Sequence, residues 1–181
     1  YKELCERDDI DLVYVATDWN SHAEVAVYAM ESGKHTAIEV PAAISLEQIW
    51  KLIDTSERTR KHCMQLENCV YDFFELTTLN MAQQGLFGEI IHTEGSYIHD
   101  LSIYWDSYWN NWWLDFNENH RGDVYPTHGI GPVAQLLNIH RGDKMNYLVA
   151  VDTKPIVGPE KVKALQGREA PNFRSGDHTL T

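Results

Sequence analysis

"DLVYVATDWNSHAEVAVYAMESGKHTAIEVP", residues 11–41, has the pattern of a strand, a helix and a second strand in succession. Residues 11–17 form a short apolar run rich in β-branched side chains, as expected for a strand buried in a parallel sheet. A polar loop follows, and a helical pattern then continues to Gly33, a common helix terminator. The residues expected on its buried face are Ala23, Ala26, Val27 and Met30. The next strand ends at Pro41, so we expect two parallel strands joined by a right-handed crossover.

The same alternation continues farther along the chain. Ser45 and Gln48 have the spacing of a capping box at the start of a helix. The apolar face expected on that helix consists of Leu46, Ile49, Trp50 and Ile53. A third strand at 62–68 and a helix at 71–84 complete a βαβαβα order, which predicts an open α/β sheet.

The pattern changes in the second half. Residues 89–98 and 145–153 read as longer strands of alternating polarity, typical of a sheet with one exposed face, and a helix is expected near 126–139. The closing residues 175–181 resemble an interrupted strand. Residues 1–17 resemble the end of a helix followed directly by a buried strand, so we expect the chain to begin inside a longer fold.

Composition excludes several classes of function. The 181 residues carry a net charge of −12, which would repel the phosphates of a nucleic acid and argues against a nucleic-acid partner. No apolar run has the length of a membrane span. The three cysteines form no CxxC pair, and the nine histidines show no HExxH spacing, so neither a disulfide framework nor a metal site is expected.

Ligands of open α/β sheets bind at the carboxyl ends of the strands. The candidates after the first strand are Trp19, Asn20, Ser21 and His22. Trp19 could stack on a nicotinamide or adenine ring, and the helix start behind it favours an anion. The alternative is packing by Trp19 and ordinary capping by Asn20 or Ser21. Glu39 ends the next strand, where a carboxylate needs a partner. A GxGxxG fingerprint is absent from the sequence.

Four of the six tryptophans lie in "LSIYWDSYWNNWWLDF", residues 101–116. Flat aromatic faces beside Asp, Asn and Tyr suit sugar rings, whose C–H faces stack on aromatics while their hydroxyls form hydrogen bonds. A subunit interface or a packed loop explains the same composition equally well.

"GDVYPTHGIGP", residues 122–132, places Tyr125 three residues before His128. Pro126 suits the first turn of a helix, on which these two side chains would face the same way. Histidine is the commonest general acid–base, whereas tyrosine needs nearby positive charge to act as a base. Gly129 and Gly131 allow close approach of another backbone. A structural role for His128 remains the alternative.

Several blocks together resemble a known family. They are the segment from "DLVYVAT" to "AIEVP", "TRKHCMQLENCVYD", "LNMAQQGLFGEI", "GSYIHDL", "YPTHGIGP" and "LNIHRGDKM". They are similar to the Gfo/Idh/MocA oxidoreductase superfamily and, within it, to the NAD-dependent glycosidases of glycoside hydrolase family 109, the α-N-acetylgalactosaminidase type. The resemblance spans nearly the whole chain.

The resemblance implies a fold and a domain division. Residues 1–69 would be the C-terminal part of a Rossmann dinucleotide-binding domain. Residues 70–181 would be a truncated α+β domain with an open, mostly antiparallel sheet, through which the protein would form homo-oligomers. The missing first strand and glycine loop imply an internal fragment that is inactive alone. The location in the cell stays open.

The resemblance also implies roles for individual residues. The NAD-binding positions are Trp19, Asn20, Ser21, His22, Glu39, Val40 and Asn68. The substrate-binding positions are Glu67, Tyr97, Trp113, Tyr125, Pro126, Thr127 and His128. Trp113 departs from the family pattern, in which arginine is expected at this substrate-binding position.

Two further departures separate the chain from ordinary dehydrogenases of the superfamily. Val40 replaces the lysine of Glu-Lys-Pro, and Gly131 replaces the histidine of Gly-x-His. The resemblance implies hydrolysis of a small-molecule glycoside, an N-acetylhexosaminide of the α-N-acetylgalactosaminide type, through transient oxidation by bound NAD, with His128, Tyr125 and Tyr97 as catalytic residues. The alternatives are a net sugar dehydrogenase, and a non-catalytic carbohydrate-binding module that relies on Trp109 or Trp112.

Overall fold

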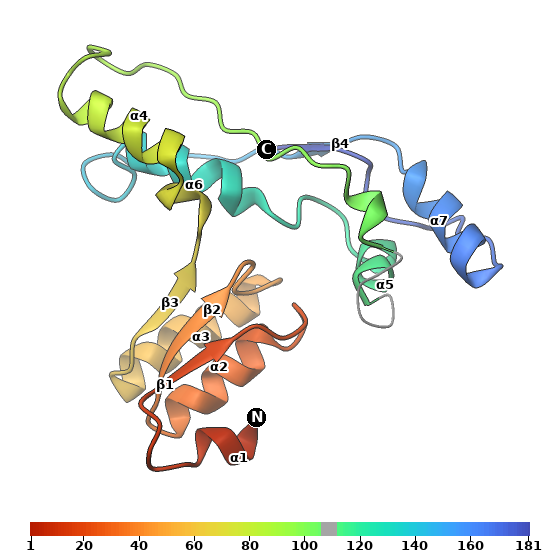
Figure 1. Cartoon of the computed structure of the whole chain (residues 1–181), viewed down its shortest axis with the longest axis horizontal. Helices are drawn as coiled ribbons and strands as arrows, with labels where there is room; N and C mark the ends of the chain where they lie inside the picture. The colour runs from red at the N-terminus through yellow and green to blue at the C-terminus, as the bar shows by residue number, and fades with distance from the viewer. Residues whose placement is uncertain (106–111) are drawn as a thin grey trace. The chain divides into compact units, whose positions relative to one another are not determined.

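The computed structural model describes residues 1–105 and 112–181, and the chain forms two compact units (Figure 1). Unit 1 comprises Tyr1–Asn80 and unit 2 comprises Met81–Thr181. Trp109 lies outside the described residues. No helix within the described ranges combines the length and the apolar character that crossing a membrane requires.

Unit 1 is built on a parallel sheet of three strands in the order β1-β2-β3. The strands are β1 (Leu12–Val15), β2 (His35–Glu39) and β3 (Cys63–Leu66), and Ala37 pairs with Tyr14 on one side and with Met64 on the other. Its helices are α1 (Lys2–Cys5), α2 (His22–Glu31), α3 (Leu46–Thr59), the short 3-10 turn η1 (Cys69–Tyr71) and most of α4 (Phe73–Gln83). The predicted α/β order is therefore confirmed.

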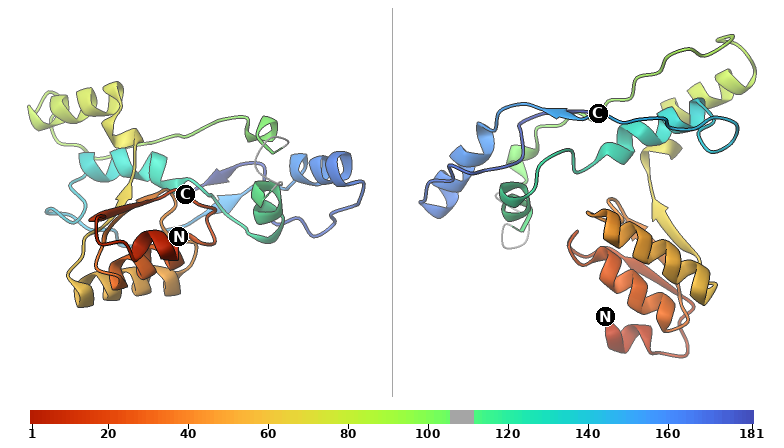
Figure 2. Two further views of the ribbon diagram at one scale, coloured as in Figure 1. Left: turned by 60° about the horizontal axis from the view of Figure 1, so that its bottom comes forward. Right: turned by 180° about the vertical axis from the view of Figure 1, so that it is seen from behind.

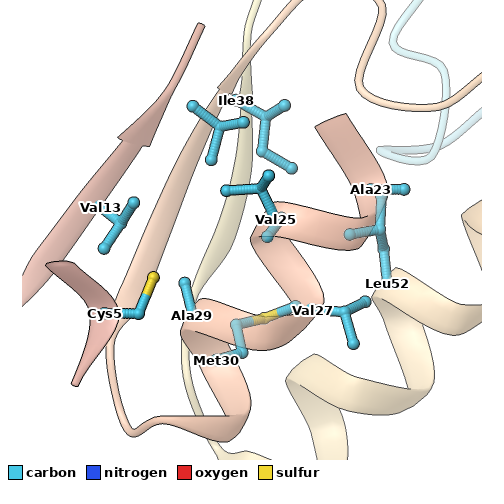
Figure 3. Packing of buried hydrophobic residues seen from close by; sticks show 11 residues of the cluster. Cys5, Val13, Ala23, Val25, Val27, Ala29, Met30, Ile38 and Leu52 are labelled. Carbon is cyan, nitrogen blue, oxygen red and sulfur yellow. The ribbon is translucent and has the colours of Figure 1, made fainter. Parts of the chain in front are cut away.

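The core of unit 1 forms where α2 packs against β1, β2 and α3 (Figure 3). All four residues expected on the inner face of α2 are buried: Ala23, Ala26, Val27 and Met30. Val13 and Val15 of β1 and Ile38 of β2 complete this cluster from the sheet. The βαβ pattern of residues 11–41 thus correctly predicts the core residues of α2 as well as the two strands.

The apolar face predicted for α3 is not a core face. Leu46, Ile49, Trp50 and Ile53 are 76%, 42%, 62% and 41% exposed. The helix instead buries Leu52 and Thr55, and it packs mainly against α2. Helical periodicity shows which side chains share a face, but the neighbouring elements determine which face is covered.

The predicted capping hydrogen bond to Ser45 at the start of α3 is confirmed, but the side chain of Gln48 bonds a different backbone N–H from the one expected in a capping box. The Gln48 backbone N–H donates to Ser45 Oγ at 3.2 Å, and Gln48 Oε1 accepts from the Ile44 N–H at 2.9 Å rather than from Ser45. We expect Ser45→Ala to weaken the start of α3 by about 1 kcal/mol, because an N–H of the first turn loses its acceptor.

The measurement for Ser45→Ala is native-state hydrogen exchange of the α3 amides, with Ser45→Asp as the matched control that keeps an acceptor oxygen. Equal protection in all three proteins would show that the cap contributes nothing.

Unit 2 contains η2 (Leu101–Ile103), α5 (Trp112–Asn119), α6 (Pro126–Leu136), α7 (Val157–Gln166) and the strands β4 (Val151–Asp152) and β5 (Thr179–Leu180). The two strands are antiparallel, and Val151 pairs with Leu180. Leu114 of α5 and Val162 of α7 pack with Ala170 and Phe173 to form its core. The interrupted strand expected at 175–181 is present as β5, and the helix expected near 126–139 is α6.

The prediction of two long strands in the second half of the chain is wrong. Residues 89–98 form an extended chain without ladder partners in the described structure, and of 145–153 only Val151 and Asp152 pair (Figures 1 and 2). Ile91 and Tyr147 are 92% and 84% exposed. Alternation gives a segment two unlike faces, but a strand also requires a neighbouring backbone to bond.

An ion pair connects β4 to Arg121, which lies two residues beyond the end of α5. The guanidinium of Arg121 donates to both carboxylate oxygens of Asp152, with Nη2 2.6 Å from Oδ1. The hydrogen bonds from Arg121 hold the pKa of the Asp152 carboxyl below its ordinary value. A depressed carboxyl pKa stabilises the fold above the unfolded value of about 3.9, and this contribution is lost as the pH falls through the folded pKa.

We expect Arg121→Gln to raise the pKa of Asp152 toward its unfolded value, because the charged donor is removed. Unit 2 should then lose less stability on acidification. Carboxyl NMR titration measures the shift, with Arg141→Gln as a control that leaves Asp152 untouched. An unchanged Asp152 titration in Arg121→Gln would contradict this assignment.

Candidate functional site

In unit 1, His22 ties together the loops that follow β1 and β2. The side chain is 1% exposed, and its Nδ1 and Nε2 atoms lie 2.8 and 2.9 Å from the carbonyl oxygens of Pro41 and Thr17. Both partners are backbone carbonyl oxygens, and the buried ring lies between them, so His22 bridges the two loops. Any effect of His22 on a ligand would therefore come through the loop positions.

The loop before α2 is organised by Asp18. Its carboxylate accepts from the backbone N–H of Asn20 at 3.1 Å and from the Ser21 hydroxyl at 2.8 Å. Ser21 is the N-cap of α2, but its side chain makes no capping hydrogen bond. The interpretation of Asn20 and Ser21 as ordinary side-chain caps is therefore wrong. The first backbone N–H groups of α2 keep the polarity that favours an anion.

Glu39, at the end of β2, has the partner that its position requires. Tyr14 of β1 donates its hydroxyl proton to Glu39 Oε1 at 3.0 Å, and this hydrogen bond raises the pKa of Tyr14. Glu39 itself is exposed, and a cis peptide bond joins Val40 to Pro41. The hydrogen bond from Tyr14 thus holds the carboxylate at the carboxyl end of β2.

The residues after β3 form the third part of this edge. Glu67 Oε1 accepts from the Cys69 N–H at 2.9 Å, and Asn68 is exposed at the start of η1. Burial, followed by the charge of Glu67, raises the pKa of the Cys69 thiol to about 11. Cys69 is therefore a thiol rather than a thiolate nucleophile near neutral pH.

Parallel pairing brings the predicted cofactor residues to one edge of the unit 1 sheet. They follow the carboxyl ends of β1 (Trp19, Asn20, Ser21, His22), β2 (Glu39, Val40) and β3 (Asn68). Trp19 is 3% exposed. A sheet edge of this kind, with an anion-favouring helix start behind it, fits a nucleotide cofactor.

In unit 2, the rings of Tyr97, Tyr125 and His128 are in mutual contact. The His128 ring centroid lies 4.3 Å from that of Tyr97 and 5.1 Å from that of Tyr125, and the two tyrosine rings are 5.8 Å apart. His128 is 8% exposed. These contacts bring together the three residues predicted to be catalytic.

The start of α6 explains how Tyr125 and His128 come together. Pro126 is the first helical residue and Tyr125 is the N-cap. The Tyr125 backbone N–H donates to Asp123 Oδ1 at 2.8 Å, which fixes the chain as it enters the helix. The two rings stack at 23°, so the expectation that they face the same way is confirmed.

Tyr97 reaches these rings because two backbones cross at glycines. A Cβ on Gly95 would lie 2.4 Å from the Gly129 carbonyl oxygen, and one on Gly129 would lie 3.0 Å from the Gly95 oxygen. The close approach expected at Gly129 is therefore confirmed, and its partner is the segment that carries Tyr97. Gly95 was missed from sequence, although its place two residues before Tyr97 was a signal.

Trp113 and Thr127 lie beside this ring cluster. Trp113 is 5% exposed, and its ring meets Tyr125 edge-on, with centroids 6.0 Å apart at 75°. Thr127 Oγ1 is buried without a hydrogen-bond partner among the described residues, so a ligand hydroxyl could satisfy it. His99 was not predicted as a site residue, but its ring centroid lies 4.4 Å from that of Tyr97.

Residues 1–66 match the family described as an oxidoreductase family with an NAD-binding Rossmann fold. An NAD-binding protein from Listeria innocua is 33% identical and covers 51% of this chain and 27% of its own, with a TM-score of 0.47. A 3-ketoreductase from Actinomadura kijaniata, solved with NADP, is 30% identical and covers 50% and 29%, with a TM-score of 0.45. The family match over residues 1–66 assigns most of unit 1 to the class of NAD-binding Rossmann folds.

Residues 71–179 match the glycosyl hydrolase 109 C-terminal domain. A glycosyl hydrolase family 109 protein from Phocaeicola vulgatus is 71% identical over all of this chain and 38% of its own length. Its counterpart from Bacteroides fragilis is 68% identical over all of this chain and 39% of its own. The chain belongs to glycosyl hydrolase family 109 and spans less than two fifths of these curated relatives.

Proposed function

We propose that the full-length protein is a glycosidase that oxidises its substrate transiently with bound NAD and acts on an N-acetylhexosaminide, specifically an α-N-acetylgalactosaminide. The observation that carries this proposal is the contact of Tyr97 and Tyr125 with His128. This group supplies proton donors and acceptors, and family membership supplies the hydrolytic class. Direct displacement would instead require two carboxylates that flank the scissile bond.

Unit 1 has the residues to hold the cofactor. The α2 start would face the phosphates, while Glu39 and Asn68 offer a carboxylate and an amide for ribose hydroxyls or the nicotinamide amide. A cofactor held by these residues would supply the oxidation at C3 of the sugar and its reversal at the end of the cycle. The choice of NAD over NADP is part of the proposal.

The residues of unit 2 handle the protons. A ketone at C3 acidifies the C2 proton, which Tyr97 or Tyr125 removes or orients for removal. The C1–O bond then breaks as the C1=C2 bond forms, and the leaving-group oxygen gains a proton from His128. Water adds back across this double bond, with its proton returning through the same residues. The buried Thr127 hydroxyl is available to position a sugar hydroxyl.

A stoichiometric assay distinguishes this reaction from net sugar oxidation. The full-length protein is incubated with NAD and an aryl α-N-acetylgalactosaminide, while the released aglycone and NADH are measured together. We expect many equivalents of aglycone per enzyme and no net NADH. NADH formed in proportion to substrate would instead identify a sugar dehydrogenase, and binding without either product would identify a carbohydrate-binding module.

A further inference from the structure

A recess of about 410 Å³ in unit 2 is lined by residues from three separate stretches of the chain. The stretches are Arg121, residues 152–155 and residues 173–174. The described lining includes none of the three rings grouped around His128. The recess is therefore separate from the residues assigned to acid–base chemistry.

The lining of this recess is positively charged although the chain is acidic. Arg121, Lys154 and Arg174 contribute three cationic groups, and Asp152 is the one acidic residue among the described residues that line it. The whole chain has 15 lysine and arginine residues against 27 acidic ones. A surplus of two positive charges at one place on such a chain favours an anionic ligand.

The Asp152 carboxylate leaves most of this positive charge available. Its side chain is only 6% exposed, whereas the side chain of its partner Arg121 is 67% exposed. Arg121 donates to Asp152 through Nε and Nη2, so among the contacts described its Nη1 group remains a donor for another acceptor. The ion pair thus covers the carboxylate and fixes the guanidinium beside the recess.

The other two cations have no competing partner. Lys154 and Arg174 form no ion pair with a carboxylate among the residues that the structure describes. By contrast, Arg168 of the same unit pairs with Glu118. Lys154 and Arg174 are both exposed, so their charges are available to a ligand from solution.

The backbone around the recess is held in place by hydrogen bonds. The Arg174 N–H donates to the Glu118 carbonyl oxygen at 3.2 Å, and the Thr153 N–H donates to the His178 carbonyl oxygen at 2.9 Å. The His178 N–H in turn donates to Thr153 Oγ1 at 3.0 Å. Within the described contacts the Thr153 hydroxyl proton is still available to a ligand. Donors ordered before binding lower the entropy cost of binding.

The arrangement of charges favours a phosphate monoester over a carboxylate. One guanidinium can bind a planar carboxylate with two parallel hydrogen bonds, whereas three cations from three stretches suit a group with three terminal oxygens. A phosphate monoester carries a charge of roughly −1.5 to −2 at pH 7, which matches the surplus of positive charge in the lining.

The size of the recess indicates that the phosphate is attached to an organic molecule. Its volume of about 410 Å³ lies within the roughly 300–1,000 Å³ of pockets that take small organic ligands. A free phosphate ion would leave much of this space to water. A small polar molecule, such as a sugar that carries the phosphate, fills it better.

We propose that this recess binds the phosphate monoester of a small polar molecule such as a sugar phosphate. Arg121, Lys154 and Arg174 hold the phosphate oxygens, and the Thr153 hydroxyl donates a further hydrogen bond. The proposal goes beyond the glycosidase function and does not depend on it, because binding here requires neither turnover nor the residues around His128.

The test is isothermal titration calorimetry of the full-length protein with glucose 6-phosphate and, separately, with inorganic phosphate. We expect saturable binding of glucose 6-phosphate and weaker binding of inorganic phosphate. Lys154→Gln and Arg174→Gln should each weaken glucose 6-phosphate binding about tenfold, because each removes a charged donor.

Lys144→Gln and Arg141→Gln are the matched controls. Each removes the same charge from an exposed residue of unit 2 outside the lining, and each should bind glucose 6-phosphate as the wild-type protein does. All four side chains are exposed, so the variants should unfold at the wild-type temperature, which excludes misfolding as the cause of a loss.

Three results would overturn the site. The first is no saturable binding of glucose 6-phosphate by the wild-type protein. The second is equal affinity in the lining variants and their controls, which would place the phosphate elsewhere or attribute its binding to diffuse charge. The third is binding of inorganic phosphate as tight as that of glucose 6-phosphate, which would exclude an organic ligand. None of these results bears on hydrolysis, so the glycosidase function is tested separately.

Discussion

His128→Ala should lower kcat for aryl α-N-acetylgalactosaminide hydrolysis by about 10²- to 10⁴-fold, the usual contribution of a general acid–base. The imidazole is 8% exposed and contacts both Tyr97 and Tyr125, so its loss removes the proton-carrying group that lies between the two rings. The measurement is steady-state hydrolysis by the full-length protein with NAD.

His92→Ala provides the control for loss of a histidine, because His92 is exposed and pairs only with Glu94 in the contacts described. A calorimetric titration should show that His128→Ala still binds NAD, because the proposed cofactor residues lie in unit 1. Hydrolysis within threefold of the wild type would rule out His128 as the source of the proton.

Gly95→Ala is expected to have the second large effect. Its Cβ would lie 2.4 Å from the Gly129 carbonyl oxygen, a backbone atom that cannot rotate away. The segment must then move off α6, which should cost about 1–3 kcal/mol of stability and separate Tyr97 from His128. We expect activity to fall at least tenfold as the ring contact is lost.

The adjacent Ser96→Ala is the matched control, since Ser96 is exposed and loses only its hydroxyl. Gly129→Ala gives an independent comparison. Helix propensity alone would make it about 1 kcal/mol more stable, whereas the crossing predicts a loss of stability. Hydrogen exchange of the α6 amides measures the change in stability. Stabilisation of unit 2 by Gly129→Ala would show that the two backbones do not meet so closely.

The parts of the fold that depend on local pattern were predictable from sequence. The run at 11–17, the helical face through Met30 and the Ser45 capping box each depend on residues close in the chain, and each is present. The exposed face of α3 and the unpaired residues 89–98 depend on which neighbours cover or bond them. Such neighbours are not encoded in the period of a short segment.

The candidate site likewise has one part that was predictable from local sequence and one part that was not. Tyr125 and His128 were predictable as a pair because Pro126 starts a helix on which three residues make nearly one turn. The contact of Tyr97 with that pair requires two glycines 34 positions apart to cross. Gly95, two residues before Tyr97, is a signal for a close approach of another backbone, but nothing in the sequence identifies Gly129 as its partner.

Deuterium exchange at C2 of the released sugar most directly tests the oxidation and elimination route. The full-length protein is incubated with NAD and an aryl α-N-acetylgalactosaminide in deuterated water, and the sugar product is examined by NMR and mass spectrometry. We expect one deuterium at C2 in the released sugar, because elimination exchanges that proton with solvent. Release of aglycone and sugar with the original C2 proton fully retained would contradict the route.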